Sequence, residues 1–166
     1  MKHMDLKALY QKIENGTFKI GVFGLGRIGL PTALIFTRKF NVIGMDINKT
    51  TIENLKKGES FVDEPGLDEI LKGSIEHNKI EFVTDTDYLV KNVDMMLVCV
   101  PTPITKDMAP DYSYISDVAN KVGKNLRKGQ IFVMESSVSP TTIETIIIPI
   151  LEKVSNLKCN SDFGVC

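Results

Sequence analysis

The sequence predicts an α/β domain built on a doubly wound parallel sheet, with a short helix ahead of it. Two observations carry this fold class. Apolar runs of strand length alternate with helical segments along most of the 166 residues, which is typical of parallel β-α-β units with right-handed crossovers. One run, at 94–100 (DMMLVCV), is almost continuously apolar, as expected of a central strand covered on both faces.

The N-terminal segment predicts a helix separate from the sheet. Apolar residues recur at helical spacing on one face from Leu6 to Ile13, and Gly16 is a typical helix stop. We therefore expect two units, an N-terminal helix over residues 1–16 and an α/β domain over residues 17–166.

Each later element has its own local signal. Thr84 is placed to cap one helix, and Ser139 followed by Pro140 is placed to open the last one, because proline suits the first helical position. The predicted strands cover 18–23, 41–45, 79–83, 94–100, 130–134 and 162–165, and the predicted helices cover 28–38, 49–57, 67–71, 84–92, 114–126 and 140–154.

Composition argues against several classes of protein. With 20 basic and 21 acidic residues the net charge is −1, so no basic excess indicates binding to nucleic acid or anionic lipid. No apolar run is long enough to span a bilayer, and the charged N-terminus lacks the apolar core of a secretory signal. Three cysteines and two histidines show no disulfide or metal-ligand pattern. We expect a reduced, metal-free, cytoplasmic protein without nucleic-acid or membrane partners.

The stretch FGLGRIGLP, residues 23–31, directly follows the first predicted strand. Gly24 allows a turn, Gly26 lies where the backbone must approach a pyrophosphate, and Gly29 lets the next helix pack against the strand. Asp46 ends the second predicted strand, where a carboxylate would accept both hydroxyls of an adenosine ribose. The alternative is a structural turn, with Asp46 merely capping the next helix.

Asp46 also bears on the choice of dinucleotide. A carboxylate about 4 Å from a ribose 2′-phosphate would cost roughly 1–4 kcal/mol, depending on the effective dielectric constant. The three residues after Asp46 include no arginine, although they include Lys49. The sequence thus predicts NAD rather than NADP.

Polar residues at the carboxyl ends of the predicted strands are candidates for the reaction site, because ligands bind there in open α/β sheets. Thr102 follows the fourth strand, and Glu135 and Ser137 follow the fifth. The two hydroxyls could hold a nicotinamide ribose or a substrate water, or could simply complete turns. Glu135 could act as a general base or merely stabilise a helix N-terminus. Glu64, in the irregular segment before the third strand, is a further candidate, or could be no more than a turn residue. Cys99 lies within the fourth predicted strand and is expected to be inert core.

Six segments together resemble the N-terminal domain of the UDP-glucose/GDP-mannose dehydrogenase family. They read FGLGRIGLPTA, NVIGMDIN, DEPGLDEIL, VCVPTPI, PDYSYI and ESSVSPTTIETIIIPIL, and they extend over nearly all of residues 18–166. Each segment is a weak signal, whereas the ordered set is specific. The resemblance implies a Rossmann-type NAD-binding domain of a nucleotide-sugar 6-dehydrogenase, an oxidoreductase of polysaccharide biosynthesis.

Family members oxidise the C6 hydroxyl of a nucleotide-activated sugar to a carboxylate with two NAD molecules in succession. A cysteine thiolate traps the aldehyde formed first, and the thiohemiacetal is oxidised to a thioester and hydrolysed. By resemblance, Ser137 takes the place of a family threonine beside the reaction centre. Glu135 is a second catalytic candidate because of its place at the end of the fifth predicted strand. The resemblance assigns NAD binding to Gly24, Gly26, Arg27, Ile28, Gly29, Asp46, Thr102 and Ser137.

The sequence departs from the family pattern in places. Serine replaces threonine at Ser137, and Pro140-Thr141 replaces the usual Pro-Gly. In the family, the catalytic glutamate, the nucleophilic cysteine, the central domain and the UDP-sugar-binding domain follow the DFGVC segment. We therefore expect them outside these 166 residues and do not assign the nucleophile to Cys166. Two explanations for the end at Cys166 stay open: an excised piece, or the boundary of an intein, since many inteins begin with cysteine.

The substrate and the activity have alternatives of their own. The segments VPTP, PDYSY and ES resemble the branch that oxidises UDP-N-acetylmannosamine or UDP-N-acetylglucosamine, with UDP-glucose as a further candidate. The resemblance implies a UDP-sugar partner and a homodimer for the full-length enzyme, and no turnover by this domain alone. The rival hypothesis is a non-catalytic Rossmann module that responds to NAD.

Overall fold

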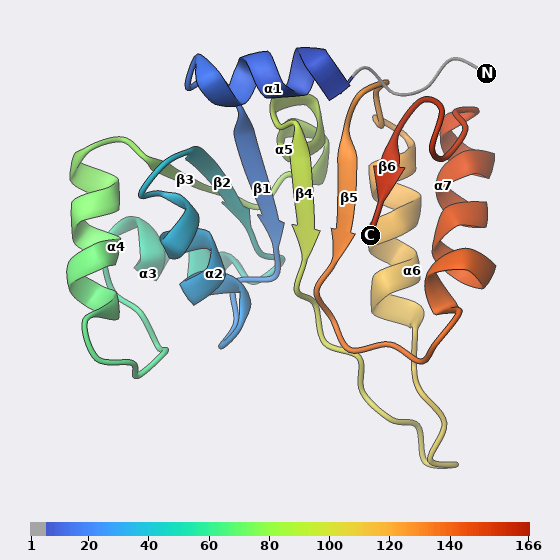
Figure 1. Ribbon diagram of the computed structural model, residues 1–166. Coiled ribbons are helices and arrows are strands. Elements are labelled where there is room, and N and C mark those ends of the chain that lie inside the picture. The colour runs from blue at the N-terminus through green and yellow to red at the C-terminus, as the bar shows by residue number, and fades with distance from the viewer. Residues whose placement is uncertain (1–5) are drawn as a thin grey trace.

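The computed structural model describes residues 6–166, and its centre is a six-stranded sheet in which neighbouring strands are parallel (Figure 1). The order β3-β2-β1-β4-β5-β6 places β1 and β4 side by side at the centre and confirms the doubly wound sheet. The strands are β1 (Lys19–Phe23), β2 (Asn41–Met45), β3 (Ile80–Val83), β4 (Met95–Val98), β5 (Ile131–Met134) and β6 (Gly164–Val165).

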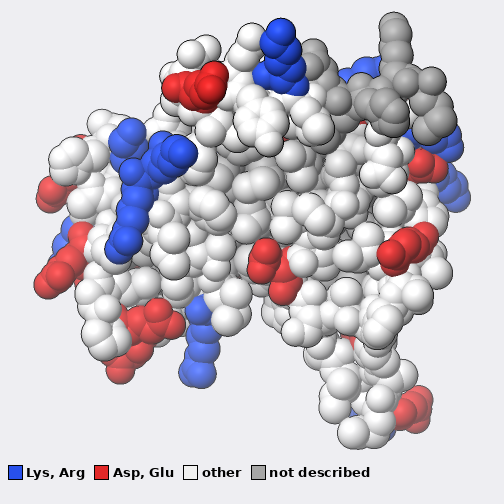
Figure 2. Space-filling view, in the orientation of Figure 1, with Lys and Arg blue, Asp and Glu red and all other residues white. Residues whose placement is uncertain are grey.

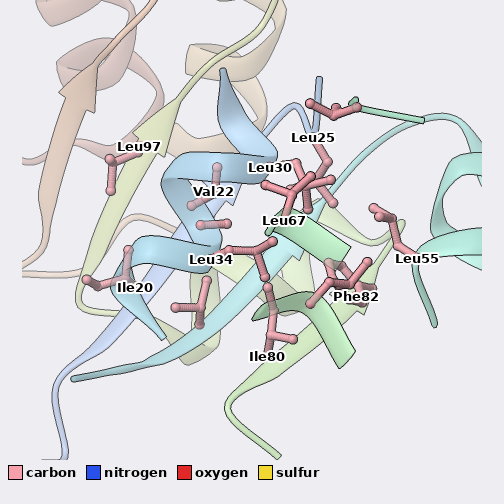
Figure 3. Close-up of a cluster of buried hydrophobic side chains, with 14 of the residues drawn as sticks. Ile20, Val22, Leu25, Leu30, Leu34, Leu55, Leu67, Ile80, Phe82 and Leu97 are labelled. Atoms are coloured by element: carbon pink, nitrogen blue, oxygen red, sulfur yellow. The ribbon is translucent and has the colours of Figure 1, made fainter. Parts of the chain in front are cut away.

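Helices cover both faces of the sheet with separate apolar cores. Leu30 and Leu34 from α2 share one core with Val22 of β1 (Figure 3), and the other core lies under α5, α6 and α7. β4 contributes Leu97 to the first core and Met96 to the second, so it is covered on both faces as predicted. Fully burying such a side chain contributes about 1.5–3 kcal/mol, so the two cores hold the layers together. The helices are α1 (Leu6–Glu14), α2 (Gly29–Phe36), α3 (Lys49–Lys56), α4 (Leu67–Glu76), α5 (Thr86–Asn92), α6 (Ser113–Gly123) and α7 (Ile148–Ser155), the last preceded by a π-helical turn, η1 (Ile143–Ile147).

α1 crosses the amino ends of the central strands (Figure 1). The buried carboxylate of Asp94, just before β4, pairs with the Lys12 ammonium of α1 and accepts the Lys19 N–H at 3.0 Å. A buried carboxylate is tolerated when it is paired and hydrogen-bonded in this way. Asp94 therefore fastens α1 to the start of both β1 and β4. Within the described part of the chain, no helix is long and apolar enough to cross a membrane.

The apolar face predicted for α1 is only half covered. Leu9 and Ile13 pack against the first core, whereas Leu6 and Tyr10 are 55% and 66% exposed. The reason is geometric: α1 lies across the rim of the sheet and not on its face, so one turn of contact is all that the core offers.

Two local predictions for the first half of the chain differ from the structure. α4 continues to Glu76, beyond its predicted end, because Ser74 is buried and shares a hydrogen bond of 2.8 Å with Thr37. α5 is capped by Asp85 rather than by Thr84, since the Asp85 carboxylate accepts two N–H groups of the first turn at 2.9 and 3.2 Å. Both residue types are good caps, so their order in the sequence did not decide which one would be used.

The predicted start of the last helix is wrong. Ser139 and Pro140 do not open it, because Thr141 has a φ of +71°, a left-handed conformation that interrupts the helix. Helical structure begins instead with the π-helical turn η1 and continues into α7. Ser139 pairs with the hydroxyl of Tyr112, by way of both its own hydroxyl and its N–H at 2.9 Å.

We expect Thr141→Gly to raise the free energy of unfolding by about 1 kcal/mol. A left-handed conformation costs an ordinary residue roughly 1–2 kcal/mol, and glycine avoids this cost at a loss of about 0.5–1 kcal/mol in backbone entropy. Urea denaturation followed by circular dichroism measures the change. Asn156→Gly, at φ +59°, is the control and should gain less, because asparagine tolerates this conformation. If the Thr141→Gly protein is no more stable than the wild type, the left-handed conformation of Thr141 does not cost the free energy expected here.

Candidate functional site

The cleft lies where four neighbouring strands end. The register aligns Met45, Phe23, Val98 and Met134 in one row that runs from β2 through β1 and β4 to β5. The segments that follow these residues therefore emerge at one edge of the sheet, where doubly wound folds bind their ligands. They line a cleft of about 610 Å³.

Charged side chains of both signs are scattered over the face shown in Figure 2, without a continuous patch of one sign. This distribution fits the net charge of −1. Among residues 6–166, no group of three or more His, Cys, Asp or Glu side chains is arranged to hold a metal ion.

Two of the three glycines in the loop after β1 are required by the protein itself. Gly24 has a φ of +84°, and a Cβ there would lie 2.8 Å from the Cys99 carbonyl oxygen. A Cβ at Gly29 would collide with the Gly24 carbonyl oxygen. These contacts let the start of α2 lie directly against the ends of β1 and β4, as predicted for Gly29.

Gly26 differs from the other two glycines. A Cβ built there meets no protein atom within 4 Å, and the residue lines the cleft. Beside it, α2 begins at Gly29 with the positive end of its helix dipole. The Leu30 N–H already donates to the Gly26 carbonyl at 3.1 Å, the Thr32 N–H donates to the Ile28 carbonyl at 3.1 Å, and Pro31 has no N–H. Among the described residues, the N–H groups of Arg27, Ile28 and Gly29 have no hydrogen-bond partner. The cleft therefore offers donors and free space to an anionic group such as a pyrophosphate.

Asp46 joins the glycine loop to the end of β2. One carboxylate oxygen accepts the Leu25 N–H and the other accepts the Asn48 N–H, both at 2.9 Å. Each oxygen keeps a lone pair for a further donor, as a ribose hydroxyl would be, and Asp46 lines the cleft. Asn48, not Asp46, caps α3, so the alternative in which Asp46 serves only as a helix cap is wrong.

The other predicted site residues fall into two groups. Thr102 after β4, together with Glu135 and Ser137 after β5, lines the same cleft, as do the exposed Arg27 and Ile28 of the glycine loop. Glu64 is not among the residues that line the described cleft. Its carbonyl accepts the N–H of Leu67 at 3.1 Å in the turn before α4, which fits its interpretation as a turn residue.

Cys99 lies one position beyond β4 and lines the cleft, so its predicted place within the strand is wrong. Burial, with a smaller contribution from the Glu135 carboxylate, raises the pKa of the Cys99 thiol to about 11. Because the thiolate is the nucleophilic form, a thiol with this pKa is unreactive at neutral pH. The expectation of chemical inertness fits this pKa.

Sequence reasoning missed the residues that helices contribute to the cleft. Motifs mark the strand ends, whereas these residues reach the cleft only because α5 and α6 pack on the second face of the sheet. No local signal distinguishes them from other positions on an amphipathic helix. They are Thr86 of α5 and Tyr114, Asp117, Val118 and Lys121 of α6.

Comparison with known proteins agrees with this geometry. Residues 18–166 match the model of the UDP-glucose/GDP-mannose dehydrogenase family, NAD binding domain. A GDP-mannose 6-dehydrogenase from Pseudomonas savastanoi pv. phaseolicola is 36% identical over 151 residues, which are 89% of this chain and 34% of that protein. A UDP-N-acetyl-D-glucosamine 6-dehydrogenase from Pseudomonas aeruginosa is 37% identical over 145 residues, 87% of this chain and 33% of that protein.

The solved structures agree as well. The crystal structure of an NDP-N-acetyl-D-galactosaminuronic acid dehydrogenase from Methanosarcina mazei Go1 has a TM-score of 0.86 at 34% identity. The similarity covers 99% of this chain and 36% of that one. The chain thus spans about a third of the length of the relatives that it matches. The match over residues 18–166 leads to one assignment. The chain belongs to the UDP-glucose/GDP-mannose dehydrogenase family, and residues 18–166 form the NAD-binding domain of that family.

Proposed function

We propose that the chain is the cofactor-binding part of a dehydrogenase that oxidises the C6 hydroxyl of a UDP-hexose to the uronate with two molecules of NAD. The proposed sugars are UDP-N-acetylmannosamine, UDP-N-acetylglucosamine and UDP-glucose. The single observation that supports cofactor binding best is Gly26, whose missing side chain faces open space. Because packing gives no reason for glycine at this position, we attribute it to a pyrophosphate that must approach the backbone.

The substrate is proposed at the level of a class. The relatives named for GDP-mannose and for UDP-N-acetyl-D-glucosamine are 36% and 37% identical to this chain. Such equal likeness fits a domain that holds the cofactor, with the contacts that select the sugar lying in other parts of the enzyme. For the whole protein, of which this chain would be about a third, we propose a UDP-sugar substrate, a cytoplasmic homodimer and full dehydrogenase activity.

Residues on the two sides of the cleft are proposed to bind different parts of the dinucleotide. In this proposal Asp46 accepts the hydroxyls of the adenosine ribose, on the side of β2. Thr102 and Ser137 orient the nicotinamide half with their hydroxyls, and the Glu135 carboxylate beside them is available to take up a proton. NAD, when bound, supplies the hydride acceptor. The pyrophosphate is assigned to the glycine loop, at Gly24, Gly26, Arg27, Ile28 and Gly29.

We expect the wild-type chain to bind NAD at least about fivefold more tightly than NADP, because the Asp46 carboxylate would repel a 2′-phosphate by roughly 1–4 kcal/mol. Asp46→Ala and Asp46→Asn should both narrow this gap. Asparagine is the matched variant, since it removes the charge and keeps an acceptor for a loop N–H. Calorimetric titration of both dinucleotides measures the ratio. Equal affinities of the wild type for NAD and NADP would refute the role given to Asp46.

We expect Gly26→Val to abolish NAD binding while urea denaturation and circular dichroism stay close to the wild type. The new side chain enters the open cleft and not the protein. Gly29→Ala is the contrasting variant, and it should lose stability because its Cβ would collide with the Gly24 carbonyl oxygen. If Gly26→Val binds NAD normally in calorimetry, the loop is only a turn.

We expect the 166-residue chain to bind NAD without forming NADH from UDP-glucose, UDP-N-acetylmannosamine or UDP-N-acetylglucosamine. Misplacing a reacting group by about 1 Å can cost roughly a hundredfold in rate, and the cleft thiol of Cys99 is protonated at neutral pH. NADH absorbance measures turnover, with the complete open reading frame that contains this chain as the comparison. Turnover by the 166-residue chain would contradict the expectation that the nucleophilic cysteine lies outside these 166 residues. If the complete protein forms no NADH with any of the three UDP-sugars, the result would favour a GDP-sugar substrate or the regulatory Rossmann module.

A further inference from the structure

Side-chain hydrogen bonds join the segment after β4 to the segment after β5 at two places. The first tie is Ser136, whose hydroxyl oxygen lies 2.7 Å from the Val100 carbonyl oxygen and 3.1 Å from that of Val98. A hydroxyl has one proton to donate, so the shorter contact marks Val100 as its main acceptor. Because β4 ends at Val98, the Val100 carbonyl lies beyond the strand ladder and is held by Ser136 instead.

The second tie is Tyr112. Its hydroxyl donates to the Ser139 hydroxyl and accepts the Ser139 N–H, both at 2.9 Å. The loop before Tyr112 is closed at its base, where the Asp111 N–H donates to the Pro103 carbonyl at 2.7 Å. Tyr112 therefore links the far end of the segment after β4 to Ser139.

The two ties bracket Thr102 and Ser137. Thr102 lies between the tied points of the first segment, and Ser137 lies between the tied points of the second. Within residues 6–166, neither hydroxyl makes a side-chain hydrogen bond of its own, so the backbone on either side sets its position. We propose that Ser136 and Tyr112 are positioning residues, which hold Thr102 and Ser137 in place for the nicotinamide half of the dinucleotide. This inference rests on the proposed function.

A dinucleotide lies across the point where the strand order reverses, so its two halves should meet the ends of different strands. The glycine loop and Asp46 belong to β1 and β2, whereas both ties belong to β4 and β5. With the adenosine ribose at Asp46, the nicotinamide half falls on the side of the ties. Loss of a tie should therefore lower the affinity for NAD and leave the affinity for ADP unchanged. ADP consists of the adenosine and two phosphates and lacks the nicotinamide half.

The test compares NAD and ADP titrations of the wild-type chain, Ser136→Ala and Tyr112→Phe by calorimetry. Each tie is one or two hydrogen bonds, so NAD affinity should fall about 2- to 10-fold while ADP affinity stays constant. Ser136→Thr keeps the hydroxyl and should retain the wild-type ratio. Ser155→Ala and Tyr88→Phe are matched controls, because they remove hydrogen bonds to Leu151 and Glu81 on other parts of the fold. Urea denaturation of each variant accompanies the titrations.

Tyr112→Phe decides the outcome, because it keeps the aromatic ring and is expected to fold even if Ser136→Ala does not. A lower NAD affinity at constant ADP affinity supports the inference. An unchanged NAD affinity, or equal losses for NAD and ADP, overturns it and leaves the proposed function standing. If the wild-type chain binds neither NAD nor ADP, the proposed function itself fails, and the inference fails with it.

Discussion

The close approach of α2 to the end of β1 is the constraint on which the rest of the cleft depends. Gly24 turns the chain beside the backbone of Cys99, and Gly29 brings the helix so near that a Cβ would overlap the Gly24 carbonyl oxygen. Between them, the Leu25 N–H is held by the Asp46 carboxylate at 2.9 Å, which fixes the loop to β2 as well. The end of β1 is thereby fixed against β2, β4 and α2 at once, and the helix N-terminus can lie over the strand ends only in this arrangement.

The two halves of the cleft are built in different ways. On the side of β1 and β2, the backbone itself sets the shape, because glycine removes the side chains that would keep α2 away. On the side of β4 and β5, side-chain hydrogen bonds from Ser136 and Tyr112 join two segments that have left the sheet. The difference suits the groups to be held: a diphosphate needs backbone donors at close range, whereas a ribose and a nicotinamide need hydroxyls at defined positions.

The contacts that stabilise the fold and the cleft proposed for binding lie at opposite ends of the strands. At the amino ends, the buried Asp94 pairs with Lys12 and accepts the Lys19 N–H, so α1 is held by one charged centre and one turn of apolar contact. At the carboxyl ends, the strained φ of Thr141 and the open position at Gly26 contribute nothing to the core. A left-handed residue such as Thr141 costs free energy, and the two apolar cores under the helices offset that cost.

The sequence by itself determined the layer architecture, the order of elements, the glycine loop and the acid at the end of β2. These features follow from apolar periodicity and from backbone conformations that only certain residues adopt. Tertiary structure alone decided which side chains share the cleft: α6 contributes Tyr114 and Lys121, Glu64 lies elsewhere, and Cys99 leaves the strand to line the wall. It also decided that Ser139 pairs with Tyr112 and caps no helix. The physical reason is that hydrogen-bond partners and cleft walls come from residues distant in the chain, and only the packed sheet and helices bring them within reach of one another.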